Sequence, residues 1–128
     1  YAMEEIVRKQ TGDYTDIIRF PGGSSNLVSR KYCEGIMSEL VGMVEEQGYS
    51  YFDWNVSSGD TGTTDPAEIY QNVVLGIQGK NTAVVLMHDL KPATIAAIPD
   101  IIDWCLERGY SFGTLCGEMK PIHHGVQN

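Results

Sequence analysis

The sequence predicts a single domain of the α/β class, in which parallel strands alternate with helices. Along its 128 residues, stretches with apolar residues at three- and four-residue spacing alternate with short runs rich in β-branched or aromatic residues. One of these runs, 82–87, is almost continuously apolar, as is typical of a strand buried on both faces of a parallel sheet. Such strand–helix–strand units could form a small open sheet or part of a barrel.

Each predicted element has its own local signal. The predicted helices span 2–10, 29–47, 66–77 and 94–108, and the predicted strands span 16–20, 49–56, 82–87 and 110–115. Glycines stand where the first, second and fourth helices end, and Asp65 with Pro66 is a typical N-cap followed by proline at the first helical position. The two adjacent histidines near the end, His123 and His124, are interpreted as an exposed tail.

Composition and charge exclude several classes of protein. Nine lysines and arginines against 17 aspartates and glutamates give a formal net charge of −8, so a nucleic acid or an anionic membrane surface is excluded as a partner. The apolar runs are far shorter than the roughly 20 residues that a transmembrane helix needs. Three cysteines, Cys33, Cys105 and Cys116, without a CxxC motif indicate neither a disulfide scaffold nor a thiolate zinc site.

Polar residues stand at the ends of three successive predicted strands. The segment 19–23 ends the first strand, 54–60 the second, and His88 with Asp89 the third. Because the carboxyl ends of parallel strands lie at one edge of a sheet, we expect these residues to share one rim. This is the edge at which α/β proteins place their active sites.

His88 is the main candidate for chemistry on this rim. An imidazole held by a carboxylate can protonate a leaving group, and Asp60 and Asp89 are its candidate partners. The alternatives are that His88 only hydrogen-bonds a neighbouring loop and that Asp89 caps the turn into the next helix. Arg19 is interpreted either as a fixed cation that orients a carboxylate or binds an anion, or as a surface arginine lying along the sheet.

The turn after the first strand and an aromatic residue near the second supply candidate binding groups. Pro21 makes the turn rigid, and Gly22 has no side chain, so a backbone N–H can point into a cleft as an oxyanion donor. The alternative is that this segment is only a turn. Trp54 could stack against a sugar face or belong to the core.

Together these segments resemble the later motifs of a known family. Arg19-Phe20-Pro21-Gly22-Gly23, the segment 54–60 and Leu86-Met87-His88-Asp89 have the order seen in the polysaccharide deacetylases. These are the NodB-homology proteins of carbohydrate esterase family four, and the resemblance is strongest to their peptidoglycan N-acetylglucosamine deacetylase-like members. It implies a distorted (β/α) barrel that binds a divalent metal, usually zinc, and removes N-acetyl or O-acetyl groups from polysaccharide.

The resemblance also implies a role for each matching residue. Arg19 would orient a catalytic-base aspartate, and the N–H of Gly22 would help to hold the oxyanion. Leu86 would line the pocket for the acetyl methyl group. Asp60 would tune His88, which would be the acid that protonates the departing amine.

The earlier motifs of the family are missing. The family's base, its metal-ligand aspartate and its two ligand histidines precede the arginine motif, whereas the segment before Arg19 contains no histidine. Family members also often carry a tyrosine where this chain has Gly22 and a tryptophan where it has Thr61. We therefore expect residues 1–128 to be the carboxyl-terminal part of a deacetylase domain, nearly inactive by itself and without a metal of its own.

Two other classes of function are kept as alternatives. One is a non-catalytic carbohydrate-binding or assembly module that retains the deacetylase fold. The other is a receiver-type signalling domain, which would need an acidic pocket where Arg19 stands. The resemblance implies an N-acetylglucosamine-containing polysaccharide as partner and an extracellular or cell-surface location. A partial barrel would expose apolar surface and strand edges, so a homodimer or domain-swapped assembly is also expected.

Overall fold

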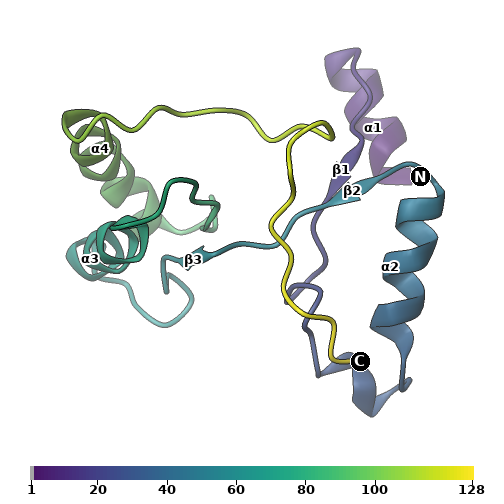
Figure 1. The fold of residues 1–128 in the computed structure, drawn as a ribbon. Coiled ribbons are helices and arrows are strands. Elements are labelled where there is room, and N and C mark those ends of the chain that lie inside the picture. The colour runs from purple at the N-terminus through teal and green to yellow at the C-terminus, as the bar shows by residue number, and fades with distance from the viewer. Residues whose placement is uncertain (1) are drawn as a thin grey trace. The chain divides into compact units, whose positions relative to one another are not determined.

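The computed structural model describes residues 2–128, which form two compact units. The first unit contains the chain up to Asp53 together with Leu115–Asn128, and the second unit is Trp54–Thr114. Figure 1 shows the course of the chain through its helices and strands. Each unit has its own pair of parallel strands and its own apolar core, so the two are described separately.

The first unit pairs two short strands and packs a helix against them. Its elements are α1 (Ala2–Thr11), β1 (Ile17–Ile18), the 3-10 helix η1 (Ser29–Lys31), α2 (Ile36–Glu46) and β2 (Ser50–Tyr51). The two strands run parallel, with Ile18 opposite Tyr51. Helix α2 packs against β2, and Phe20, Met37 and Tyr51 form the buried core there.

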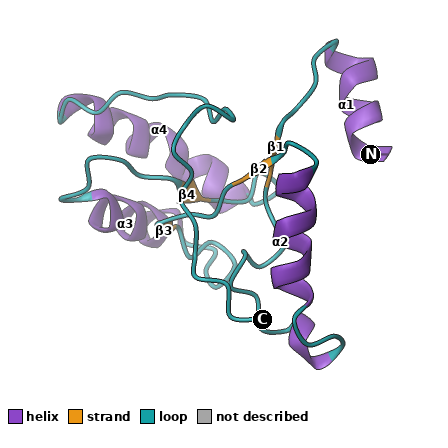
Figure 2. Cartoon of the chain, turned by 45° about the vertical axis from the view of Figure 1, so that its right-hand side comes forward, coloured by secondary structure: helices purple, strands orange, loops and turns teal. Residues whose placement is uncertain are grey.

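The second unit packs two helices on a second pair of parallel strands. Its elements are β3 (Val56–Ser57), α3 (Pro66–Ile77), β4 (Val85–Leu86) and α4 (Pro92–Glu107). Helices α3 and α4 lie side by side (Figure 2), and their buried faces supply most of the core. Gly76 lets α3 approach β3 closely, because a Cβ at this position would lie 2.6 Å from Cγ1 of Val56.

Local sequence signals explain several helix boundaries. Helix α3 begins as predicted, since the Asp65 side chain accepts a hydrogen bond from the N–H of Ala67 at 2.9 Å and Pro66 is the first helical residue. Gly12 follows α1 and Gly109 stands just beyond α4, both with a positive φ that terminates the helix. Within residues 2–128, no helix has the length and apolar character needed to cross a membrane.

The α/β class is confirmed, but the second predicted helix was wrong as a single element. It does not run unbroken from 29 to 47, because Gly35 adopts a φ of 83° between η1 and α2. That left-handed conformation suits glycine and interrupts the helical hydrogen-bonding pattern. The apolar spacing across the segment had concealed the interruption.

Three predictions about the strands were also wrong. The run 49–56 contains two strands, β2 and β3, which pair with different partners. No strand forms over 110–115 in the described part of the chain, where 111–115 are exposed and bury nothing against a sheet. The run 82–87 is not buried on both faces as predicted, since Thr82 is exposed and 83–87 are half-buried.

Candidate functional site

His88 and Asp60 lie beyond the carboxyl ends of the paired strands of the second unit. Asp60 follows β3 and His88 follows β4, and the parallel register, with Ser57 opposite Leu86, brings the two together. Nδ1 of His88 lies 2.8 Å from Oδ1 of Asp60, and the backbone N–H of His88 donates to Oδ2 at 2.7 Å. The structure thus joins the imidazole to one of its two candidate carboxylates.

The Asp60 carboxylate is buried and fully hydrogen-bonded. Its residue is 2% exposed, and Oδ2 also accepts a hydrogen bond from the hydroxyl of Thr94 at 2.9 Å. Burial alone would raise the pKa of Asp60, but the hydrogen bonds from the His88 ring, the Thr94 hydroxyl and the His88 backbone outweigh it and lower that pKa. Asp60 is therefore ionised at neutral pH.

An ionised Asp60 determines which nitrogen of His88 carries a proton. A carboxylate can only accept, so Nδ1 must donate, and Nε2 is the nitrogen available to exchange a proton with another molecule. The His88 side chain is 38% exposed, against 3% for that of Asp60. This arrangement fixes the orientation of the imidazole through Nδ1 and leaves Nε2 on the side of the ring away from Asp60.

Thr94 is a residue of this cluster that the sequence analysis missed. It lies in the first turn of α4 and is 1% exposed. A threonine near a helix start predicts a cap or a surface position, and nothing in the sequence indicates that its hydroxyl contacts a carboxylate 34 positions earlier. The alternative role of Asp89 as a cap was wrong, since Lys91 is the N-cap residue of α4 and Asp89 is exposed.

Leu86 and Trp54 also belong to the second unit. Leu86 is the last residue of β4, two positions before His88, and is half-buried. Trp54 is half-buried and precedes β3. Their positions agree with either a wall of a binding site or the margin of the core.

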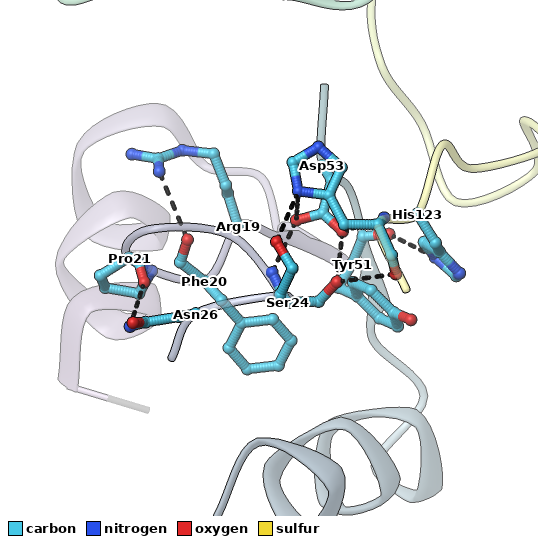
Figure 3. Close-up of polar contacts among 10 residues, drawn as sticks. Arg19, Phe20, Pro21, Ser24, Asn26, Tyr51, Asp53 and His123 are labelled. Carbon is cyan, nitrogen blue, oxygen red and sulfur yellow. Dashed lines mark hydrogen bonds and ion pairs between the residues drawn. The ribbon is translucent and has the colours of Figure 1, made fainter. Parts of the chain in front are cut away.

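Arg19, Pro21 and Gly22 lie in the first unit, in the turn that follows β1. Arg19 is exposed, and its Nη1 donates to the carbonyl of Phe20 at 3.4 Å. Figure 3 shows its guanidinium extending away from the Asp53 carboxylate. Position 22 favours glycine, because the φ of Gly22 is 73° and a Cβ there would lie 3.3 Å from the side chain of Asn26.

Asp53 is a second buried carboxylate that the sequence analysis passed over. Its side chain is fully buried and accepts hydrogen bonds from Ser24 (Figure 3) and from the backbone N–H of His124. Burial alone would raise the pKa of Asp53, but hydrogen bonds from the Ser24 hydroxyl and from the backbone of His124 and Ser24 lower it. The signal available in the sequence was an aspartate between aromatic residues at the end of a strand.

The interpretation of the two histidines near the end as an exposed tail was wrong for His124, whereas His123 is exposed but still contacts the first unit. His123 stacks on Tyr51, with ring centroids 3.7 Å apart, and its Nε2 donates to the carbonyl of Tyr51 at 2.9 Å. His124 is half-buried, with Nδ1 3.1 Å from Oγ of Ser25. The stretch 122–124 therefore packs beside β2 instead of extending into solvent.

A divalent metal with protein ligands needs a group of donor side chains that lie close together. Residues 2–128 contain no group of three or more histidine, cysteine, aspartate or glutamate side chains that could hold an ion. A divalent metal with protein ligands therefore does not fit on this part of the chain alone.

The expected common rim draws on both units. Arg19 and the turn after it belong to the first unit, whereas the Asp60–His88 pair, Leu86 and Trp54 belong to the second. Within each unit the predicted residues stand at the carboxyl end of a parallel strand, except Trp54, which precedes β3. Their meeting at one site stays a prediction.

Comparison with known proteins gives a consistent set of similarities. No protein-family model matches the chain. The chain is 33% identical over 119 residues to YheN of Bacillus subtilis, a protein named provisionally as a polysaccharide deacetylase, covering 88% of the chain and 39% of YheN. It is 32% identical over 120 residues to the peptidoglycan-N-acetylglucosamine deacetylase of Bacillus cereus, covering 88% of the chain and 44% of that protein.

A solved structure extends the similarity to the fold. The chain superimposes on the catalytic domain of peptidoglycan N-acetylglucosamine deacetylase from Eubacterium rectale with a TM-score of 0.95 and 46% identity. The match covers 99% of this chain and 59% of that one. The chain thus spans less than half the length of the two curated relatives and somewhat more than half of the solved domain.

Proposed function

Because this chain belongs to the polysaccharide deacetylase family and matches part of its catalytic domain, we propose that it carries the acid-bearing part of a hydrolase. The reaction would remove N-acetyl or O-acetyl groups from a polysaccharide. The parent domain would hold the remaining groups, including the catalytic base. The substrate class follows the names of the relatives, two of which are peptidoglycan N-acetylglucosamine deacetylases.

The observation that carries the proposal is the hydrogen-bonded pair of Asp60 and His88. When an acetamide is hydrolysed, water oxygen bonds to the carbonyl carbon, the C–N bond breaks, and the departing nitrogen must gain a proton. A protonated His88 would supply that proton from Nε2, while the ionised carboxylate of Asp60 stabilises the positive imidazolium through Nδ1. After the transfer, His88 would be neutral and acetate and the free amine would leave.

The turn of the first unit would serve the carbonyl end of the same reaction. The N–H of Gly22 would donate to the oxyanion that forms when water adds, and Arg19 would orient the base contributed by the parent domain. Pro21 would fix the turn, and Trp54 and Leu86 would contact the sugar and the acetyl methyl group. These roles are proposed from the matching motif positions.

A divalent metal, expected to be zinc, would supply Lewis-acid chemistry in the complete domain, with ligands from outside this chain. Residues 2–128 contain no group of donor side chains that could hold it. No step on this chain is therefore assigned to a metal. We also propose an extracellular or cell-surface location. The homodimer or domain-swapped assembly stays a prediction for the isolated chain.

The proposal is tested by acetate release from N-acetylglucosamine oligomers by the parent protein. His88→Gln should lower the turnover rate about 100-fold or more, the usual contribution of a general acid. The loss should be much smaller with 4-nitrophenyl acetate, whose leaving group departs without a proton. Asp89→Asn is the matched control, since this exposed carboxylate adjoins His88 in sequence but lies outside the hydrogen-bonded pair.

Two results would contradict the proposal in different ways. Unchanged acetate release by the His88 variant would remove the acid role. Absence of release by the unaltered parent protein, together with binding of the oligomers, would instead favour the non-catalytic carbohydrate-binding module.

A further inference from the structure

We propose that Asp53 is a positioning residue that holds the turn at 20–24 and joins it to the segment 122–124. The consequence for catalysis rests on the proposed function, because this turn carries Gly22 and follows Arg19. The contacts that join the turn to the segment 122–124 all lie within the first unit.

The carboxylate of Asp53 is bonded to two segments that are far apart in the sequence. One oxygen, Oδ1, accepts the N–H of Ser24 at 2.8 Å, and the other, Oδ2, accepts the Ser24 hydroxyl at 2.5 Å. Oδ2 also accepts the N–H of His124 at 2.7 Å. The Asp53 backbone N–H donates to the carbonyl of Ile122 at 2.8 Å, so both the backbone and the side chain of Asp53 contact the later segment.

These partners suit a carboxylate that fixes geometry. The Asp53 side chain is 0% exposed, and its three donors at hydrogen-bonding distance are two backbone N–H groups and a hydroxyl. Buried carboxylates usually need such compensation, and backbone donors supply it only when the two segments keep one fixed arrangement. The bonds therefore restrain the turn and the later segment at the same time.

The turn needs an external restraint because its own residues provide little. Gly22 and Gly23 both adopt positive φ, and glycines are the residues that lose most conformational freedom when ordered. Inside the turn, the N–H of Gly23 donates to the carbonyl of Phe20 at 2.9 Å. The side-chain amide of Asn26, just after the turn, donates to the carbonyl of Pro21 at 3.1 Å. Ser24, directly after the glycines, is the point at which Asp53 holds both the backbone and the side chain.

The opposite end of the turn is held by packing. Phe20 is buried in the core, with its ring 5.5 Å from that of Tyr51. The two glycines therefore lie between two fixed residues: Phe20, which is held by packing, and Ser24, which is held by hydrogen bonds. The direction of the Gly22 N–H depends on both anchors, so loss of the Asp53 anchor should misdirect this donor without moving β1.

A nucleophilic serine site is a different interpretation of the same residues, and the geometry argues against it. Ser25 Oγ lies 3.1 Å and Asp53 Oδ1 4.0 Å from the same ring nitrogen, Nδ1 of His124. A serine–histidine–aspartate triad requires the serine on one ring nitrogen and the aspartate on the other. The cluster is therefore a structural anchor.

The test uses Asp53→Asn, which preserves volume but replaces one acceptor oxygen with a donor. In this chain, hydrogen exchange of the Ser24 and His124 amides should become at least tenfold faster. In the parent protein, kcat for acetate release should fall about tenfold to hundredfold with KM within about twofold, because an oxyanion donor acts in the transition state. Asp65→Asn, altering an exposed helix cap, is the matched control and should change neither measurement.

A second pair of variants keeps the test decisive if Asp53→Asn fails to fold. Ser24→Ala removes the hydroxyl, which lies 2.5 Å from Oδ2 of Asp53 and 3.2 Å from the carbonyl oxygen of His124, but keeps the bond from the Ser24 N–H. It should shift exchange and kcat in the same direction by a smaller factor, whereas Ser24→Thr, which keeps a hydroxyl, should restore both. Unchanged exchange at Ser24 and His124 would overturn the proposal. Faster exchange with unchanged kcat would overturn the positioning role. An inactive unaltered parent would refute the proposed function, and the exchange rates would still decide whether Asp53 holds the turn.

Discussion

Replacing Asp60 with asparagine should reverse the tautomer of His88 at a small cost in stability. In the native cluster Oδ2 accepts two hydrogen bonds, from the His88 N–H and the Thr94 hydroxyl, and Oδ1 faces the His88 ring. Asparagine has one acceptor oxygen, and we expect it to take the Oδ2 position, where two donors converge. Its NH₂ group would then face Nδ1, which must become an acceptor, so the ring proton moves to Nε2.

The magnitudes follow from the number of bonds at each oxygen. Asp60→Asn keeps two of the three bonds and replaces the third, so we expect a loss of about 1–2 kcal/mol in the free energy of unfolding. Asp60→Ala removes all three and leaves the hydroxyl of Thr94, a residue 1% exposed, without this acceptor. Its cost should be about 3–5 kcal/mol.

Two spectroscopic measurements report these effects. The chain's two tryptophans, Trp54 and Trp104, both lie in the second unit, so urea unfolding followed by tryptophan fluorescence reports that unit. The ¹⁵N chemical shifts of the His88 ring distinguish the Nδ1–H from the Nε2–H tautomer. Asp65→Ala is the control, because it removes one exposed cap bond worth about 1 kcal/mol and should leave the ring unchanged.

Two results would refute this reasoning. An Nδ1–H tautomer that persists in Asp60→Asn at neutral pH would show that the carboxylate does not determine the proton position. Equal losses for Asp60→Asn and Asp60→Ala would show that the two bonds to Oδ2 contribute nothing measurable.

Two further predictions concern close packing and acid sensitivity. Gly76→Ala should destabilise the second unit by about 1–3 kcal/mol, because the added Cβ would clash with Val56. Gly42→Ala should instead stabilise the first unit by about 0.5–1 kcal/mol, because Gly42 lies in α2 with open space around it. Urea unfolding followed by circular dichroism measures both changes. Because the pKa values of Asp53 and Asp60 lie below the ordinary 3.8 in the folded chain, their contribution to stability is present above that value and is lost as the pH falls through the folded pKa. The urea midpoint should therefore drop as the pH falls below about 4, and a smaller drop in Asp60→Asn is expected; an equal drop would contradict the assignment.

The parts of the fold that depend on local chemistry could be predicted from the sequence. The start of α3 follows from Asp65 and Pro66, because an N-cap bond spans only two residues. The break at Gly35 could not be predicted, because the apolar spacing on either side of it is compatible with one continuous helix. The split of 49–56 into β2 and β3 was hidden for a similar reason, since strand composition does not specify which partner a residue pairs with.

The sequence by itself determined the α/β class, the order of the motifs, and the choice of Asp60 and His88 as a pair worth testing. Apolar periodicity and residue type are local properties, and the order of parallel strands predicts which residues reach a strand end. Only the tertiary structure decided that Asp60, not Asp89, bonds to the imidazole of His88, and that the Thr94 hydroxyl donates a further hydrogen bond to Asp60. It also decided that Asp53 binds both Ser24 and His124. Hydrogen bonds between residues dozens of positions apart depend on how strands and helices pack, and neither spacing nor composition encodes that packing directly.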